Sequence, residues 1–133
     1  MDKDNLIEVG LFKKEFNKIL GTSLPIYIIY QSKGLSSHMI KRRHFKCLKH
    51  IGDISDIINN PDYIGINPNE SGDSIEFVKK FKDNIMIGIK LNVEDNYLYV
   101  STIHDITESK ISNRLFSGRL KIFNNDIDNT TIE

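Results

Sequence analysis

The sequence has a single cysteine and no long apolar run, and each shortage excludes a class of protein. Cys47 can form no disulfide within the chain and cannot build a cysteine-based metal cage. No stretch approaches the roughly 18 consecutive apolar residues that a membrane-spanning helix needs. The first ten residues, MDKDNLIEVG, lack the basic start and apolar centre of a secretory signal. We therefore expect a cytoplasmic protein with no membrane contact.

The chain also has no net charge, because 18 basic residues balance 18 acidic ones. The charges are nevertheless unevenly distributed along the chain. Residues 33–50 hold six lysines and arginines, no acid, and three of the four histidines. Residues 51–133 hold eight basic residues against fourteen acids, which gives −6. A local field of this kind can attract an anion even when the whole molecule is neutral. The alternative interpretation is a solvated cationic helix face.

The length of 133 residues and the hydrophobic content of 39% suit one domain with an ordinary core. No internal repeat and no linker divides the chain. We expect a single domain over residues 1–123. The remaining residues, 124–133, read NNDIDNTTIE and predict a polar, frayed tail.

Hydrophobic periodicity predicts helices mainly in the first half of the chain and strands in the second. Helices are expected over residues 12–20, 35–49, 53–59 and 107–115. Strands are expected over residues 6–9, 25–30, 75–82, 85–91 and 97–104, with an apolar pair at 120 and 122. Residues 31–34 and 94–96 predict turns, and residues 61–73, rich in proline, glycine and asparagine, predict a loop. The order favours an α+β fold with helices gathered on one side of a roughly four-stranded antiparallel sheet.

The most specific polar cluster is SHMIKRRH, residues 37–44. On a helix, at about 100° per residue, His38 and His44 lie roughly 120° apart with Lys41 midway between them. Arg42 lies about 40° to the other side of His38. Two imidazoles beside a cation suit phosphoester transfer, because one can take the proton of an RNA 2′-hydroxyl and the other can protonate the leaving oxygen. The alternative is that these are ordinary surface or core histidines.

Metal-binding patterns are absent from the sequence. Histidines at i and i+6 fit zinc poorly, because helical pairs that share a metal sit at i and i+4 with a carboxylate nearby. There is no glycine-rich phosphate loop and no carboxylate cluster suited to magnesium. We therefore expect neither a metal nor another cofactor.

A second polar group lies in STIHD, residues 101–105. Strict strand alternation places Thr102 and His104 on the face of the apolar Leu98 and Val100. If that face packs inward, Thr102 and His104 continue it to its rim, near the basic helix. The opposite face would then offer polar and aromatic side chains to RNA, including a tyrosine able to stack on a base: Tyr99, Ser101 and Lys90. The alternative is that Thr102 and His104 simply end a strand.

A third group lies in RLFSGRLK, residues 114–121. Arg114, Arg119 and Lys121 are able to hold phosphates. The alternative is that they are cations flanking a helix end, with Gly118 as its cap.

In their order, these segments resemble the phage-barnase-EndoU-colicin-RelE-like nuclease group (PBECR), in particular its third subgroup. The resemblance runs from Tyr30 to Lys121. It rests on YQSKGLSSHMIKRRH, DIINNPDYIGINPNESGDSIEFVKKF, IMIGIKL, YLYVSTIHDI and RLFSGRLK. It implies N-terminal helices followed by a four-stranded antiparallel sheet. It also implies metal-independent RNA cleavage that leaves a 2′,3′-cyclic phosphate, in a domain similar to those of phages, mobile elements and toxins.

Carried over by position, the family's helix histidine falls on His38 and its basic-histidine pair on Arg43 and His44. The family's polar strand position falls on Thr102, with His104 close by.

The sequence thus predicts an endoribonuclease with RNA as substrate. His38 and His44 would share acid and base work, and three cations would hold the phosphate: Lys41, Arg43 and Arg119. Thr102 and His104 would complete the catalytic site from the sheet. Residues expected to bind substrate are Arg42, Tyr99, Ser101, Arg114 and Arg119. Two alternatives stay open: a catalytically silent RNA-binding module, and an interaction domain whose basic helix meets an acidic partner such as an inhibitor or antitoxin.

Overall fold

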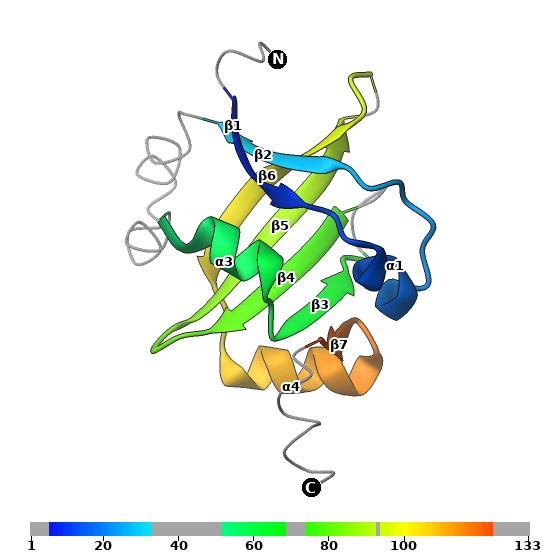
Figure 1. The fold of residues 1–133 in the computed structure, drawn as a ribbon. Coiled ribbons are helices and arrows are strands. Elements are labelled where there is room, and N and C mark those ends of the chain that lie inside the picture. Colours follow the sequence, from blue (N-terminus) through cyan, green and yellow to red (C-terminus); the bar gives the residue numbers. More distant parts are fainter. Residues whose placement is uncertain (1–5, 33–51, 69–73, 93, 124–133) are drawn as a thin grey trace, which may run out of the picture.

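The computed structural model describes residues 6–32, 52–68, 74–92 and 94–123 (Figure 1). The helix expected over 35–49 and the tail at 124–133 lie outside these residues. Along the described chain the elements are β1 (Leu6–Leu11), α1 (Lys14–Leu20), β2 (Ile28–Ser32), α3 (Ile54–Asn59), β3 (Tyr63–Ile66), β4 (Ser74–Lys80), β5 (Asn84–Asn92), β6 (Tyr97–Asp105), α4 (Glu108–Ser117) and β7 (Leu120–Ile122). No helix of the described part is long and apolar enough to cross a membrane.

The strands form one sheet in the order β1-β2-β6-β5-β4-β3-β7. All neighbouring strands are antiparallel except β2 and β6, which are parallel. The α+β class predicted from the sequence agrees with this arrangement. The predicted strand number does not, because the sheet of the described residues has seven strands where about four were expected. The extra members are short strands from both ends of the described chain and from the predicted loop.

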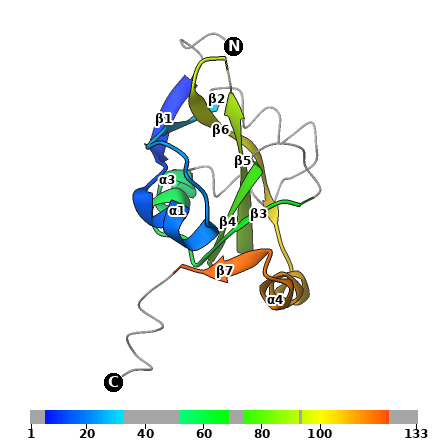
Figure 2. The ribbon, with the colours of Figure 1, turned by 90° about the vertical axis from the view of Figure 1, so that its right-hand side faces the viewer.

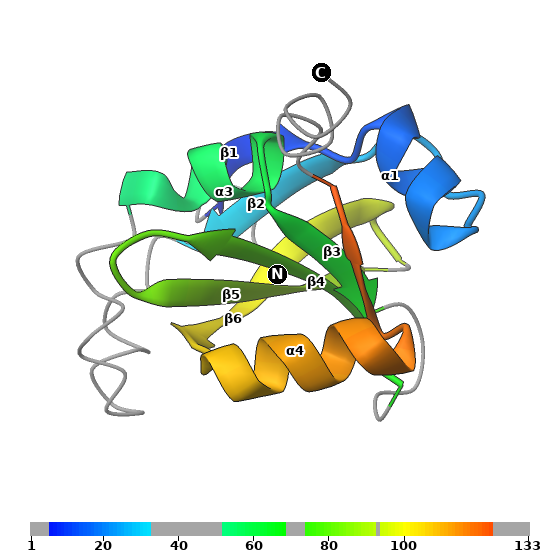
Figure 3. The same cartoon turned by 90° about the horizontal axis from the view of Figure 1, so that it is seen from below.

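Helices cover both faces of the sheet, not one side as predicted. α1 and α3 lie over one face, and α4 lies over the other at the end where β3 and β7 meet (Figures 2 and 3). The apolar residues are divided accordingly into a main core under α1 and α3 and a smaller one under α4. In the described part of the chain, α4 covers only part of this second sheet face. The candidate site lies on the part that α4 does not cover.

The central strands have the alternation that their sequence predicts. Ile85, Ile87 and Ile89 of β5 point into the main core and are fully buried. On β4, Phe77 enters the same core, where its ring lies 5.1 Å from that of Phe16 in an edge-to-face arrangement. Burial of these large side chains fixes the register of the sheet, because a slip by one residue would turn them all to the other face.

The two helices over the main core lie where the sequence predicts them. α3 buries the three isoleucines expected to point inward: Ile54, Ile57 and Ile58. α1 begins at Lys14, two residues after the predicted start, because the Phe12 amide donates to the Tyr27 carbonyl at 2.8 Å and extends the β1–β2 pairing. Gly21 ends α1 in the left-handed conformation, with φ of 71°.

The strand expected over 25–30 and the loop expected over 61–73 both differ from the structure. β2 begins at Ile28, three residues after the expected start, and continues through Gln31 and Ser32, which were expected to turn. Gln31 and Ser32 stay extended because they pair with β1. The predicted loop at 61–73 contains β3, whose backbone is paired with β4 on one side and β7 on the other. Its glycine and flanking prolines masked the strand in the sequence.

Gly65 of β3 is required by the close approach of β7. A Cβ at this position would overlap the carbonyl oxygen of Arg119. We predict that Gly65→Ala lowers the free energy of unfolding by about 1–3 kcal/mol, because the β3–β7 pairing must shift to admit the methyl group. Gly52→Ala is the matched control, since a Cβ there meets nothing within 4 Å. Thermal unfolding of both variants checks this, and equal melting temperatures would contradict it.

Candidate active site

A β-bulge in β6 decides which side chains reach the open face of the sheet. Gly88 of β5 pairs with Thr102, whereas the next residue of β5 pairs with Val100, so Ser101 is the extra residue. The Ser101 hydroxyl donates to the Gly88 carbonyl at 3.0 Å and holds the bulge. Alternation is reset there, so Ile103, not Thr102, continues into the main core.

The predicted orientation of this strand is therefore wrong. Thr102 and His104 do not share the face of Leu98 and Val100. They point to the opposite face together with Tyr99, because an extra residue shifts the period-two pattern by one. Since no residue type specifies such a bulge, alternation alone gave the wrong face.

The open face is organised in rows of neighbouring residues across the strands. One row runs from Thr102 through Gly88 to Glu76. Because Gly88 has no side chain, the space between the Thr102 hydroxyl and the Glu76 carboxylate stays open. A Cβ at Gly88 would lie 2.7 Å from Thr102 Oγ1, so even a methyl group would crowd the hydroxyl.

A hollow of about 220 Å³ lies over this row. Five residues singled out from the sequence line it: Ser101, Thr102, His104, Arg114 and Arg119. They come from β6, from α4 and from the turn before β7, so the fold brings together segments that the sequence separates. Tyr99 does not line this hollow, although it lies on the same sheet face, with its ring 6.4 Å from that of Tyr97.

The hollow also contains residues that the sequence interpretation missed: Asn67, Ser74, Glu76, Met86 and Gly88. Glu76 is the most informative of them, because this carboxylate is only 2% exposed. In the sequence it is one acid in an alternating strand, where a solvent-facing position is the usual assignment. No local sequence pattern indicates that Glu76 is buried.

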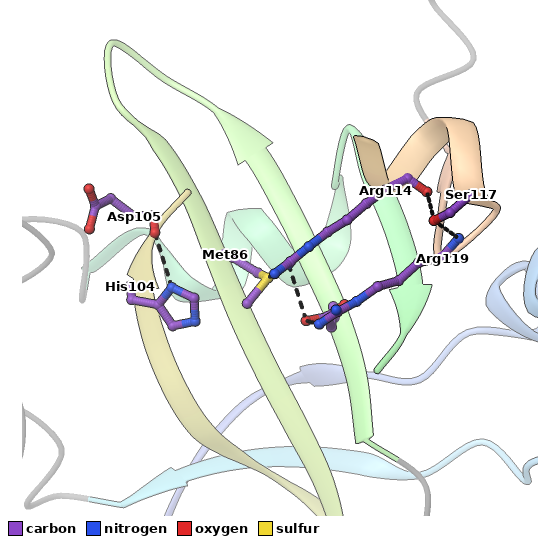
Figure 4. A network of polar contacts seen from close by, with 7 residues as sticks. Met86, His104, Asp105, Arg114, Ser117 and Arg119 are labelled. Carbon is purple, nitrogen blue, oxygen red and sulfur yellow. Dashed lines mark hydrogen bonds and ion pairs between the residues drawn. The ribbon is translucent and has the colours of Figure 1, made fainter. Parts of the chain in front are cut away.

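Glu76 is buried because arginines bind it. Arg119 Nε and Nη2 donate to the two carboxylate oxygens at 2.8 Å each, a bidentate pair. Arg114 Nη1 lies 3.5 Å from Glu76 Oε2 and 3.2 Å from the sulfur of Met86. Figure 4 shows both arginines extending over the sheet from the α4 side. Bidentate, charge-assisted pairing of this kind is what a buried carboxylate requires.

The two guanidiniums differ in their electrostatic surroundings. Burial lowers the pKa of Arg114; Glu76 opposes this shift and the charge of Arg119 adds to it. The hydrogen bonds to Glu76 raise the pKa of Arg119. Both groups stay charged at neutral pH, because arginine does not deprotonate in proteins. Two cations against one carboxylate leave one net positive charge, which matches the single negative charge of a phosphodiester.

The ends of α4 explain how the arginines reach the hollow. The Thr107 hydroxyl caps the start of the helix by accepting from the Lys110 amide at 3.2 Å. Gly118 ends it in the left-handed conformation, with φ of 85°. This cap reverses the chain, so Arg114 in the last turn and Arg119 just beyond it converge on one carboxylate. The predicted cap at Gly118 is confirmed, and it coexists with the grouping of the two cations.

His104 lies on the β6 side of the hollow. It is the cross-strand neighbour of Met86, whose sulfur contacts Arg114. Its Nδ1 lies 3.0 Å from the carbonyl oxygen of Asp105 (Figure 4). Because a carbonyl oxygen can only accept, Nδ1 must carry the hydrogen in this contact. In the neutral ring, Nε2 is then the nitrogen that can take up a proton.

The remaining predicted site residues are His38, Lys41, Arg42, Arg43 and His44. All five lie outside the described residues, so their relation to the hollow stays a prediction. Within the described ranges, no group of three histidine, cysteine or acidic side chains is placed to hold a metal ion.

Comparison with protein-family models gives a match. The family model described as phage-Barnase-EndoU-ColicinE5/D-RelE like nuclease3 matches residues 7–113. The matched range contains the basic segment, the bulged strand β6 and most of α4. Arg119 lies beyond it. No curated protein matches the chain, and no solved structure does.

The ion pair at the centre of the hollow should contribute to the stability of the folded protein. Glu76→Gln keeps the shape of the side chain and removes the charge that compensates two partly buried guanidiniums. We expect it to lower the free energy of unfolding by about 2–4 kcal/mol. Glu108→Gln is the matched control, because Glu108 is exposed and pairs with Lys80 at 3.4 Å on the surface. Chemical denaturation measures both, and an equal effect of the two substitutions would refute the assignment.

Proposed function

This chain belongs to the phage-Barnase-EndoU-ColicinE5/D-RelE like nuclease3 family, and we propose that it is an endoribonuclease that works without a metal ion. The family makes it a nuclease; RNA as substrate and the mechanism are the proposal. The observation that carries the proposal is the hollow in which a buried carboxylate holds two guanidiniums opposite a threonine and a histidine.

The proposed reaction is an internal transfer. The 2′-oxygen of a nucleotide attacks the neighbouring phosphorus, an O2′–P bond forms and the P–O5′ bond breaks. A base takes the 2′-hydroxyl proton and an acid supplies a proton to the departing 5′-oxygen, so the products are a 2′,3′-cyclic phosphate and a 5′-hydroxyl end. Fixed cations stabilise the charge that grows on the phosphorane oxygens.

The described residues support a phosphate position over Gly88. Arg119 has five N–H donors and gives two of them to Glu76, so up to three can serve a bound phosphate. Because Glu76 holds its guanidinium in place, little rearrangement is needed when charge develops. Thr102 and His104 flank the same space from β6, and His104 Nε2 can accept a proton.

The basic segment supplies the rest of the proposed site. His38 and His44 share the acid and base steps, and Lys41 and Arg43 hold the phosphate together with Arg119. Contacts along the bound strand come from a further set: Arg42, Tyr99, Ser101 and Arg114. An acidic inhibitor or antitoxin protein would compete for the same cations.

The mechanism predicts which bond is cut. In buffer with EDTA, we expect cleavage of a defined RNA oligonucleotide and sparing of the same bond when its 2′-hydroxyl alone is replaced by hydrogen, because the nucleophile is then missing. Gel analysis of end-labelled substrates, with the all-ribo oligonucleotide as control, reads out both. Cleavage that needs added metal, or equal cutting of the deoxy bond, is incompatible with the proposal. Salt-sensitive binding without any cleavage would identify the silent RNA-binding module.

The acid–base assignment predicts how histidine substitutions change the cleavage rate. His38→Ala and His44→Ala should each reduce the cleavage rate by about 10²–10⁴, the usual contribution of a positioned proton donor or acceptor. His104→Ala should also reduce it. His50→Ala is the matched control, because His50 belongs to the same basic segment and has no proposed role. Single-turnover cleavage rates at constant salt test the set, and full activity of the first two variants would show that the acid and base lie elsewhere.

A further inference from the structure

A second hollow, of about 230 Å³, lies at the turn between β5 and β6. Tyr27, Tyr30 and Tyr97 line it, together with Ile26, Ile28 and the turn residues Asp95 and Asn96. The rings of Tyr30 and Tyr97 meet edge to face, with 5.3 Å between their centroids. Tyr97 is held in place by the Asn92 amide, which lies 3.3 Å from its hydroxyl.

This hollow lies on the same sheet face as the candidate active site. Leu98 and Ile29 pair with each other and are buried in the main core, so Tyr97 and Tyr30, their neighbours along the strands, point to the open face. Further along β6, the bulge at Ser101 turns Thr102 to that face as well. At about 3.3 Å per residue, Tyr97 and Thr102 are on the order of 15 Å apart.

Tyr99 lies between the two hollows. Its ring is 6.4 Å from that of Tyr97, and it pairs with Tyr30 across β2. Tyr97 is only 3% exposed, whereas Tyr30 and Tyr99 are partly exposed, so these two rings are the ones open to a strand that leaves the arginine-lined hollow along β6.

The chemistry of the two hollows differs. The hollow over Gly88 has two guanidiniums. The tyrosine-lined hollow has no lysine or arginine among its described lining residues and has Asp95 at its edge. A phosphate would be repelled by the Asp95 carboxylate, whereas an uncharged aromatic ring fits the tyrosines and the exposed side chains of Ile26 and Ile28. The volume is below the roughly 300–1,000 Å³ of pockets for larger ligands.

We propose that the tyrosine-lined hollow is a nucleobase subsite, which takes an unpaired base a short distance along the strand from the cleaved phosphodiester. The inference rests on the proposed function for the identity of the strand as RNA. It names the substrate class more closely, because a base can enter the hollow only when it is out of a duplex. Base–aromatic stacking is how proteins hold single strands without reading every hydrogen bond.

The first test does not depend on cleavage. Adenosine, an uncharged probe, is titrated into the full chain and followed by NMR, with ribose 5-phosphate as the probe without a base. We expect adenosine to shift the resonances of Tyr30 and Tyr97, and ribose 5-phosphate to leave them unchanged. Tyr30→Leu should weaken adenosine binding about tenfold and Tyr30→Phe should restore it, because stacking needs the ring and not the hydroxyl.

The matched control is Phe116→Leu, which removes an exposed aromatic ring outside the hollow. Phe116 is 94% exposed, and two residues from Arg114 it points roughly 200° around α4. It should leave adenosine affinity unchanged. Adenosine binding that is equal in Tyr30→Leu and the unmodified chain, or shifts confined to other residues, would overturn the subsite.

A second test joins the subsite to the reaction. RNA oligonucleotides with one abasic position, moved one nucleotide at a time past the cut bond, should show a drop in cleavage rate at one spacing and not at others. Pairing the same position with a complementary strand should produce the same drop. A uniform rate at every spacing would overturn the subsite while leaving the nuclease proposal intact. Adenosine binding at Tyr30 with no cleavage of any RNA would support the subsite and overturn the nuclease proposal.

Discussion

The bidentate pair between Glu76 and Arg119 is the interaction on which the candidate site depends. A carboxylate that is 2% exposed is tolerated only with full compensation, and the two guanidiniums provide it. The pair also joins elements: β4 carries Glu76, α4 carries Arg114, and the turn before β7 carries Arg119. The same contact that holds α4 and β7 against the sheet thus positions the positive charge of the hollow.

Two backbone irregularities give this charge a space in which to act. The bulge at Ser101 turns Thr102 and His104 out of the core and onto the arginine-bearing face. Gly88 leaves the floor between them and Glu76 without a side chain. A regular strand with any larger residue at 88 would have buried the histidine or filled the hollow. The site is therefore built from departures from the regular sheet, as is common beside functional sites.

Those departures also explain what the sequence could and could not predict. The β5 strand, α3 and the end of α4 were predictable, because apolar period and a capping glycine are local signals. β3 was missed because its pairing with β4 and β7 is non-local, and Gly65 and its neighbours resemble a loop. From the sequence, Arg114 and Arg119 were predicted to bind the substrate together with residues of β6. The role of Glu76 was not predicted, because it is buried only through its contacts with two arginines from a distant segment.

The distribution of charge reconciles a neutral chain with a polyanionic substrate. In the described part, two arginines of the open face converge on Glu76, Lys90 pairs with Tyr99 further along the sheet, and an acid lines the tyrosine-lined hollow. A uniform basic surface would attract RNA in any register. A cationic hollow followed by an aromatic one lined by Asp95 instead favours registers in which a phosphate and an unpaired base fall at the right separation. Specificity for strand geometry would then come from the spacing along β6, which the sheet holds rigid, without any excess of positive charge.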